Sequence, residues 1–169
     1  EDGWFCLSLA KAYARAGRPG AARELLREVG FLAFTKPHLE QSRLLAAVGA
    51  CALSWGDSSG ENALEMSLEL IESQRVEPSC DQLLALESWF AAAADVPGRA
   101  NPDLARRAWA CVLVRLSVLD QCRILDTSAE HLAKNGLRES AFDLAELILG
   151  FHDLPLAKAE RVVAACVKL

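Results

Sequence analysis

Three glycines constrain the fold of this chain most, because each one ends a helical pattern that resumes a few residues later. Gly17, Gly56 and Gly136 each follow an alanine-rich segment in which apolar residues recur with the spacing of an α-helix. Glycine is the residue that most easily adopts the left-handed backbone conformation that closes a helix. We therefore expect the chain to turn back on itself at each of these glycines and to form a hairpin of two helices.

Helical spacing extends over almost all of the 169 residues, and no strand pattern of useful length interrupts it. Glycine, proline and polar clusters divide the chain into its expected helices. Pro19, Pro37, Pro102 and Pro155 are each expected in a first helical turn, where the missing amide proton has no helical partner to lose. The expected helices lie near residues 3–16, 19–33, 37–55, 60–75, 79–95, 102–117, 119–135, 138–150 and 154–168.

The spacing of the turns predicts an internal repeat of about 40 residues, because Gly17 and Gly56 are about 40 residues apart and Gly56 and Gly136 about 80. A further junction is then expected at residues 95–98, Asp-Val-Pro-Gly. The pattern predicts an all-α fold, a right-handed α-solenoid of about four and a half helix hairpins that forms one domain over residues 1–169. Because the sequence begins with Glu1 rather than Met, we expect it to be part of a longer chain. The expected hairpins cover about 1–35, 36–76, 77–117 and 118–152, followed by a terminal helix at 154–169.

Small and large residues of the first and last hairpins resemble the tetratricopeptide motif, although the family unit of about 34 residues is shorter than the spacing found here. The segment from Leu70 to Ala93 instead resembles the join between repeats of pentatricopeptide proteins, in which Val76-Glu-Pro78 leads into the next first helix. Both resemblances imply a stack of hairpins that binds through the surface lined by the first helix of each hairpin. The tetratricopeptide-like positions are Cys6, Leu9, Ala10, Tyr13, Gly17, Ala22 and Leu26, and then Ala129, Leu132, Gly136, Ala141, Ala145 and Ile148.

The resemblance to tetratricopeptide proteins implies which side chains face a protein partner. Members that grip a C-terminal carboxylate use a lysine and asparagine clamp, which is not matched here because Leu7 and Ala50 occupy its positions. We expect a non-catalytic scaffold or adaptor that mediates protein–protein interaction within a larger assembly. The implied first-helix surface is mixed and modestly basic and carries Lys11, Arg15, Arg43, Arg123, Asp126, Glu130 and Lys134.

The resemblance to pentatricopeptide proteins implies RNA as an alternative partner, since members of that family select bases with a polar residue of the first helix. Ser8 and Thr127 occupy roughly that place, whereas Ala47 occupies it in the second repeat. The net charge of −5 and the lack of aromatic or basic enrichment argue against a protein whose main role is to neutralise phosphates. An RNA-binding or ribonucleoprotein component, such as an organellar ribosome-associated protein, is the alternative function, and an all-helical enzyme is a third.

Four glutamates are spaced to share one face of a single helix. Glu61, Glu65, Glu69 and Glu72 recur at intervals of three or four residues. A solvated helix face is the simpler interpretation, and a docking surface for a basic partner is the more specific alternative. The four tryptophans fall in different expected helices, and most are expected to be core residues or wedges between repeats; they are Trp4, Trp55, Trp89 and Trp109.

No cofactor or metal site is expected. The six cysteines include no Cys-x-x-Cys pair, and most lie among small apolar residues, which is typical of buried free thiols. The three histidines are far apart in the sequence, so they do not form a zinc motif. Cys122, beside Arg123 on a helix that also carries His131, is the best candidate nucleophile, but a packing role is favoured. Glu130 and His131 are expected to be a surface pair rather than an acid–base pair.

The expected environment follows from the thiols and the apolar runs. Free thiols favour a reducing intracellular compartment, and neither the cytoplasm nor an organelle such as the mitochondrial matrix or a plastid is preferred. No apolar run approaches the roughly 20 residues that span a bilayer, so no membrane partner is expected. A small-molecule substrate is not expected either.

Overall fold

The computed structural model describes residues 2–73, 80–96, 101–151 and 153–169. These residues form nine α-helices and no strand, which confirms the all-α prediction. The segment Val76-Glu-Pro78 and the last two residues of the expected junction at 95–98 lie outside the described residues. The helices are α1 (Asp2–Arg15), α2 (Pro19–Ala33), α3 (His38–Ser54), α4 (Ser59–Glu72), α5 (Cys80–Ala94), α6 (Pro102–Arg115), α7 (Val118–Lys134), α8 (Arg138–Leu149) and α9 (Leu156–Lys168).

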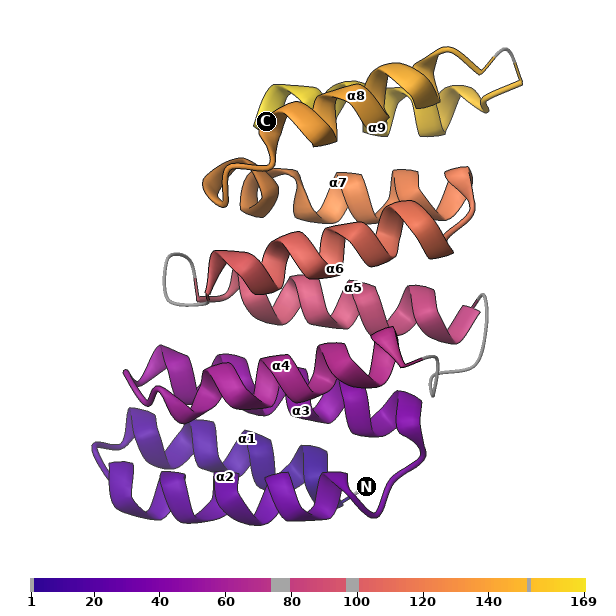
Figure 1. The fold of residues 1–169 in the computed structure, drawn as a ribbon. Helices are drawn as coiled ribbons and strands as arrows, with labels where there is room; N and C mark the ends of the chain where they lie inside the picture. The colour runs from indigo at the N-terminus through magenta and orange to yellow at the C-terminus, as the bar shows by residue number, and fades with distance from the viewer. Residues whose placement is uncertain (1, 74–79, 97–100, 152) are drawn as a thin grey trace.

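The helices follow one another through the molecule in chain order (Figure 1). The odd-numbered helices pack in sequence, α3 on α5, α5 on α7 and α7 on α9, and each even-numbered helix packs on the odd-numbered helices before and after it. Among the described residues, the helices that pack together are one or two places apart along the chain. The chain therefore runs from one end of the molecule, formed by α1 and α2, to the other, formed by α8 and α9 (Figure 1).

The three predicted glycine turns have the same geometry. Gly17, Gly56 and Gly136 have φ angles of 72°, 77° and 73°, which confirms the prediction of a left-handed residue after each helix. In each turn the residue after the glycine donates its N–H to a carbonyl five positions earlier, which is the Schellman pattern of a helix end. These three bonds join Arg18 to Tyr13 at 2.9 Å, Asp57 to Ala52 at 3.0 Å and Leu137 to Leu132 at 2.9 Å.

Prolines mark four of the helix starts, in two different positions. Pro19 and Pro102 lie in the first helical turn, as predicted. Pro37 and Pro155 are instead the N-cap residues of α3 and α9, so the first-turn prediction was wrong for them. An N-cap needs an extended backbone, which proline adopts readily, and its carbonyl still accepts the first helical bond, here from the Gln41 N–H at 2.8 Å.

The backbones of α3 and α4 approach each other closely. A Cβ atom on Gly49 would come within 2.7 Å of the Gly60 carbonyl oxygen, and a Cβ atom on Gly60 would meet the Gly49 carbonyl oxygen in the same way. Two turns away, the fully buried hydroxyls of Ser42 and Ser67 bond across the same interface: Ser67 Oγ donates to the Ser42 carbonyl at 2.8 Å, and Ser42 Oγ to the Ser67 carbonyl at 3.2 Å. Helix axes approach this closely only where the contact residues are small.

Two tryptophans join neighbouring helix pairs in the middle of the core. Trp89 and Trp109 are buried and both make edge contacts with Phe90, at ring-centroid distances of 5.3 and 6.4 Å. The Trp89 indole donates to the Leu64 carbonyl of α4 at 3.0 Å, and the Trp109 indole donates to Ser140 Oγ of α8 at 2.9 Å. This confirms the prediction that these two residues belong to the core. The other tryptophans, Trp4 and Trp55, are more exposed.

We expect Gly49→Ala and Gly60→Ala to lower the free energy of unfolding by about 1–3 kcal/mol, because the new methyl group meets the backbone of the partner helix. Gly30→Ala in α2 is the matched control, since a Cβ atom there meets nothing within 4 Å and alanine favours the helix by about 1 kcal/mol. Urea denaturation followed by circular dichroism measures all three variants. Equal stability of the Gly49→Ala and Gly30→Ala variants would contradict the close α3–α4 contact.

Candidate partner-binding surfaces

The predicted first-helix residues lie on the odd-numbered helices, and several of them tie these helices together. The contacts join α3 to α5, α5 to α7 and α7 to α9, so they hold successive odd-numbered helices in register. Arg43 and Arg123 thus form contacts with the neighbouring helix and also remain partly exposed to solvent. The three contacts are Arg43 Nε to Ser88 Oγ at 3.1 Å, the ion pair of Arg123 with Glu87, and Lys168 Nζ to the Asp126 carbonyl at 3.3 Å.

The remaining predicted residues of this surface are exposed. Lys134 Nζ donates to Glu130 at 2.6 Å one turn away on α7, and this contact lowers the pKa of the Glu130 carboxyl. Lys11 and Arg15 are exposed on α1 and form no ion pair among the described residues. The odd-numbered helices therefore present charges of both signs rather than one continuous basic strip.

The two hydroxyls considered for RNA selection are exposed but bonded to their own helices. Ser8 Oγ donates to the Trp4 carbonyl at 3.0 Å, and Thr127 Oγ1 donates to the Ile124 carbonyl at 3.1 Å. Such local bonds use the hydroxyl proton and leave the oxygen lone pairs toward solvent. Each hydroxyl therefore presents an acceptor, not a free donor, to a ligand.

His131 lies under a small hollow of about 130 Å³ that Glu130 and Lys134 also line. The imidazole is only 5% exposed and makes an edge contact with Phe90 at 6.2 Å. Burial, and to a lesser extent the Lys134 charge, lowers its pKa. The prediction that Glu130 and His131 form a surface pair is wrong. Adjacent residues of a helix point about 100° apart, and of these two only Glu130 is exposed to solvent.

The lowered pKa of His131 predicts that stability depends on pH. The pKa of the imidazole is about 6.5 in the unfolded chain and is lower in the folded chain. Between these values the unfolded state binds more protons, so the free energy of unfolding falls as pH decreases from about 6.5 toward the folded pKa. Urea midpoints at several pH values should show this loss, and His131→Gln should reduce it. His38→Gln, at an exposed position of α3, is the control; an identical pH dependence of the His131→Gln variant and the unmodified chain would contradict the assignment.

Two of the four glutamates of α4 are engaged by α6. Arg107 donates to Glu72 through Nε at 3.0 Å and Nη2 at 2.6 Å, and to Glu65 through Nη1 at 3.0 Å. These carboxylates, Glu72 before Glu65, raise the pKa of the Arg107 guanidinium above its ordinary value. Arg115 donates to the Ile71 carbonyl in the last turn of α4 at 2.6 Å, where the partial negative charge of a helix end attracts a cation.

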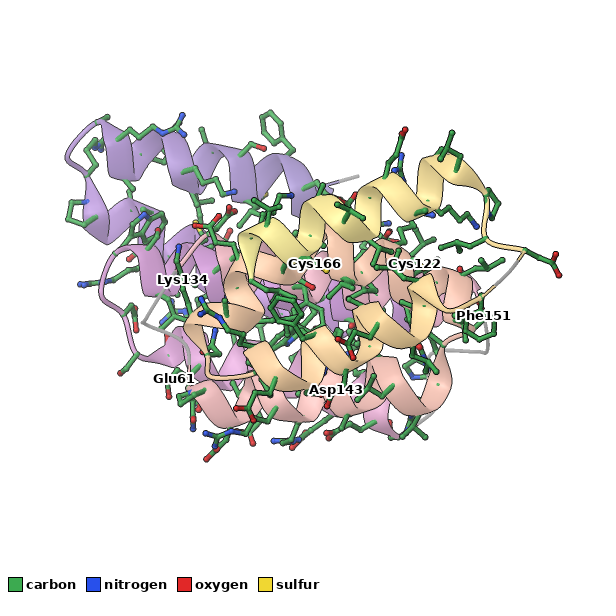
Figure 2. The ribbon with its side chains drawn as sticks, turned by 90° about the horizontal axis from the view of Figure 1, so that it is seen from above. Glu61, Cys122, Lys134, Asp143, Phe151 and Cys166 are labelled. Atoms are coloured by element: carbon green, nitrogen blue, oxygen red, sulfur yellow. The ribbon has the colours of Figure 1, made fainter. Side chains whose placement is uncertain are left out.

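The other two glutamates of α4 are placed differently from this pair. Glu61 is half-buried near the start of the helix (Figure 2), and Glu69 is exposed on the flank that faces α2. Because residues seven apart lie almost one above the other on a helix, Glu65 and Glu72 share one arginine while Glu69 is rotated away from it. The predicted acidic face is thus divided between an internal contact and the Glu69 carboxylate, which has no ion-pair partner among the described residues.

We expect Arg107→Ala to lower the free energy of unfolding by about 1 kcal/mol, because it removes a forked carboxylate contact at a partly exposed position. Arg106→Ala is the matched control: Arg106 pairs only locally with Asp103 on the exposed side of α6, so its loss should change stability by less than about 0.5 kcal/mol. Urea denaturation at low and high salt checks both variants. Equal effects of the two substitutions would show that Arg107 does not join α4 to α6.

A groove between α2 and α4 was not anticipated from the sequence. These two helices are not a packed pair, and α3 runs beneath the gap between them. A hollow of about 500 Å³ lies along α2, and a second hollow of about 320 Å³ lies toward the end of α4. Phe34 lines both, so the two hollows adjoin, and we call them together the α2–α4 groove. Its floor on α3 consists of Gln41, Leu45, Val48 and Ala52.

The walls of the groove expose large apolar side chains. Phe31 and Phe34 are 69% and 54% exposed on the α2 side, and Met66 is 36% exposed on the α4 side. At one end Arg23 of α2 pairs with Asp57 at 3.6 Å, and hydrogen bonds from Ser59 followed by the Arg23 charge lower the pKa of the Asp57 carboxyl. These exposed apolar side chains make the groove a candidate interaction site.

The sequence does contain a signal for this groove. The buried stripe of α2 is regular, and Phe31 and Phe34 fall outside it. Large aromatic residues off the buried stripe of an amphipathic helix indicate a surface that something else covers. The stripe itself consists of Ala22, Leu26, Val29 and Ala33.

The cysteine side chains that the structure describes are buried or half-buried. Cys122 of α7 is buried and Cys166 of α9 is half-buried (Figure 2), on two helices that pack on each other, and burial raises the pKa of the Cys122 thiol. A raised pKa disfavours the thiolate that a nucleophile needs. Within the described part of the chain, no group of His, Cys, Asp and Glu side chains is arranged to hold a metal ion, and none of the described helices is long and apolar enough to cross a bilayer.

Comparison with protein-family models, with curated proteins and with solved structures finds no match to this chain. The geometry of the two surfaces is therefore the basis for assigning a function.

Proposed function

We propose that the chain is a non-catalytic scaffold or adaptor that binds other proteins within a larger assembly. The observation that carries this proposal is the α2–α4 groove, whose floor is apolar except for Gln41 and whose α2 side carries two largely exposed phenylalanines, Phe31 and Phe34. Protein partners insert apolar and aromatic anchors into hollows of this kind and cover the surrounding surface. The mixed charges of the odd-numbered helices supply a second accessible surface.

We further propose that the architecture is a right-handed α-solenoid of tetratricopeptide- or pentatricopeptide-like hairpins with a period of about 40 residues. Its support is the shared geometry of the turns at Gly17, Gly56 and Gly136, together with packing between helices that are near in chain order. Stacks of this kind keep the outer faces of their helices accessible along the whole length, which suits a scaffold.

The charges around the groove favour a protein partner over RNA. On the first hollow, Arg23 and Arg27 are balanced by Glu24 and Asp57, and Glu69 adds a negative charge to the second hollow. A surface that grips a phosphate backbone needs an excess of cations. The mostly apolar floor and the balanced rim therefore support the protein interpretation.

We expect a photoreactive benzoylphenylalanine at Phe31 or at Lys134 to crosslink to protein in cells that express the chain at its native level. The same group at exposed Arg138, outside both surfaces, is the control. Crosslinked proteins from either surface that exceed those from position 138 support the scaffold, and none from both surfaces contradicts it. Binding of single-stranded RNA by the purified chain with a steep salt dependence would instead favour the ribonucleoprotein alternative.

A further inference from the structure

We propose that the α2–α4 groove binds one amphipathic α-helix of a partner protein, antiparallel to α2 and α4, with an acidic side chain opposite Arg27 and a basic side chain opposite Glu69. This inference rests on the proposed protein-binding function and specifies the chemistry of the partner. Three features support it. They are the length of the groove, the lack of strand backbone with which an extended peptide could form hydrogen bonds in the described structure, and the positions of the charged side chains along the groove.

The length of the groove matches a short helix. On the α4 side the lining residues are Ser59 at one end and the segment from Met66 to Ser73 at the other, and the span between the two ends corresponds to about 20 Å or a helix of about 14 residues. The two hollows, of about 500 and 320 Å³, lie one after the other along this length and share Phe34. A bound helix presents apolar side chains at positions i, i+4 and i+7 to such a row of hollows.

The floor of the groove favours a helix over an extended peptide. An extended peptide gains affinity from main-chain hydrogen bonds to a sheet edge, and the described residues form no strand. The floor residues Leu45, Val48 and Ala52 carry no polar side-chain atoms, and they lie inside α3, where backbone groups bond along the helix. An occupant must therefore satisfy its own backbone hydrogen bonds, as an α-helix does.

The charges of the walls give the occupant a direction. Arg27 is exposed on the α2 wall and Glu69 on the α4 wall, and neither has an ion-pair partner among the residues that the structure describes. Along the groove these two side chains are about two helical turns apart. The sequence of a bound helix should therefore carry an acidic and a basic residue about seven positions apart, on the rim rather than among its apolar anchors.

The partial charges at the ends of α2 and α4 favour the same orientation of the bound helix. α2 and α4 each run antiparallel to α3, so their positive N-terminal ends lie together near the Arg23–Asp57 pair (Figure 1). At the other end α2 has no basic residue in its last turn, and Glu69 adds a full negative charge nearby. A bound helix antiparallel to both places its own negative C-terminal end toward Arg27 and its positive N-terminal end toward Glu69.

Selection from a library of displayed helical peptides tests this proposal. The peptides have about 14 residues, leucine at i, i+4 and i+7, and randomised flanking positions. They are selected on the purified wild-type chain and counter-selected on Phe31→Asp. We expect enriched peptides to carry basic residues in the N-terminal half and acidic residues in the C-terminal half. Their affinity should fall at least about tenfold on Phe31→Asp and on Arg27→Glu.

A charge exchange and a matched control complete the test. A peptide whose acidic residue is changed to lysine should bind Arg27→Glu better than the parent peptide does, whereas Arg106→Glu, an exposed change on α6, should leave the affinity of the parent peptide unchanged. Both Arg27 and Arg106 are exposed, and circular dichroism and urea midpoints of their variants verify that the fold is retained.

Other outcomes overturn the proposal. These are no enrichment above Phe31→Asp, enriched peptides of the opposite or no charge polarity, and a concentration-dependent dimer of the chain that Phe31→Asp abolishes, which would assign the groove to a second copy. In each case crosslinks to other proteins from Lys134 would leave the scaffold function standing, so failure of the helix proposal and failure of the function are distinguishable.

Discussion

The close contact of α3 with α4 is the interaction on which the rest of the structure depends. Gly49 and Gly60 allow the two backbones to meet, and the buried hydroxyls of Ser42 and Ser67 bond to each other's helix within the same interface. Because α3 also packs on α2 and α5, the position of this pair determines where the helices before and after it lie. The same helix then serves as the floor of the groove, since its stripe through Leu45 and Val48 faces the gap between α2 and α4.

The even-numbered helices are joined differently at successive positions, and this difference creates the groove. Between α4 and α6, Arg107 grips two carboxylates and Arg115 binds the end of α4. Between α2 and the turn before α4, the Arg23–Asp57 pair is longer, at 3.6 Å, and Arg23 is more exposed than Arg107, and pairs of that kind add little stability. A forked arginine contact closes one junction, whereas a single long ion pair leaves the other open to solvent.

Features set by local chemistry were predictable from the sequence. The turns at Gly17, Gly56 and Gly136 follow from the backbone freedom of one residue type, and the helix positions follow from apolar spacing. The groove was not predicted, because it depends on two helices that are not adjacent in the chain and do not pack. The glutamates of α4 were recognised as a face, yet only the position of Arg107 on α6 determines that Glu65 and Glu72 are paired and Glu69 is not. His131 was predicted to lie at the surface because it follows the charged residue Glu130. The apolar positions around it indicate a buried side chain.

Packing between helices that are near in chain order also governs how the molecule opens. Contacts of this kind give a low contact order, so few long loops must close before a helix pair becomes stable. The terminal pairs have neighbours on one side only, whereas the aromatic cluster of Trp89, Phe90 and Trp109 lies in the middle of the chain. Amide exchange should consequently be slowest around this cluster and fastest toward α1 and α9, which makes the stability of this protein a profile along its length and not a single value.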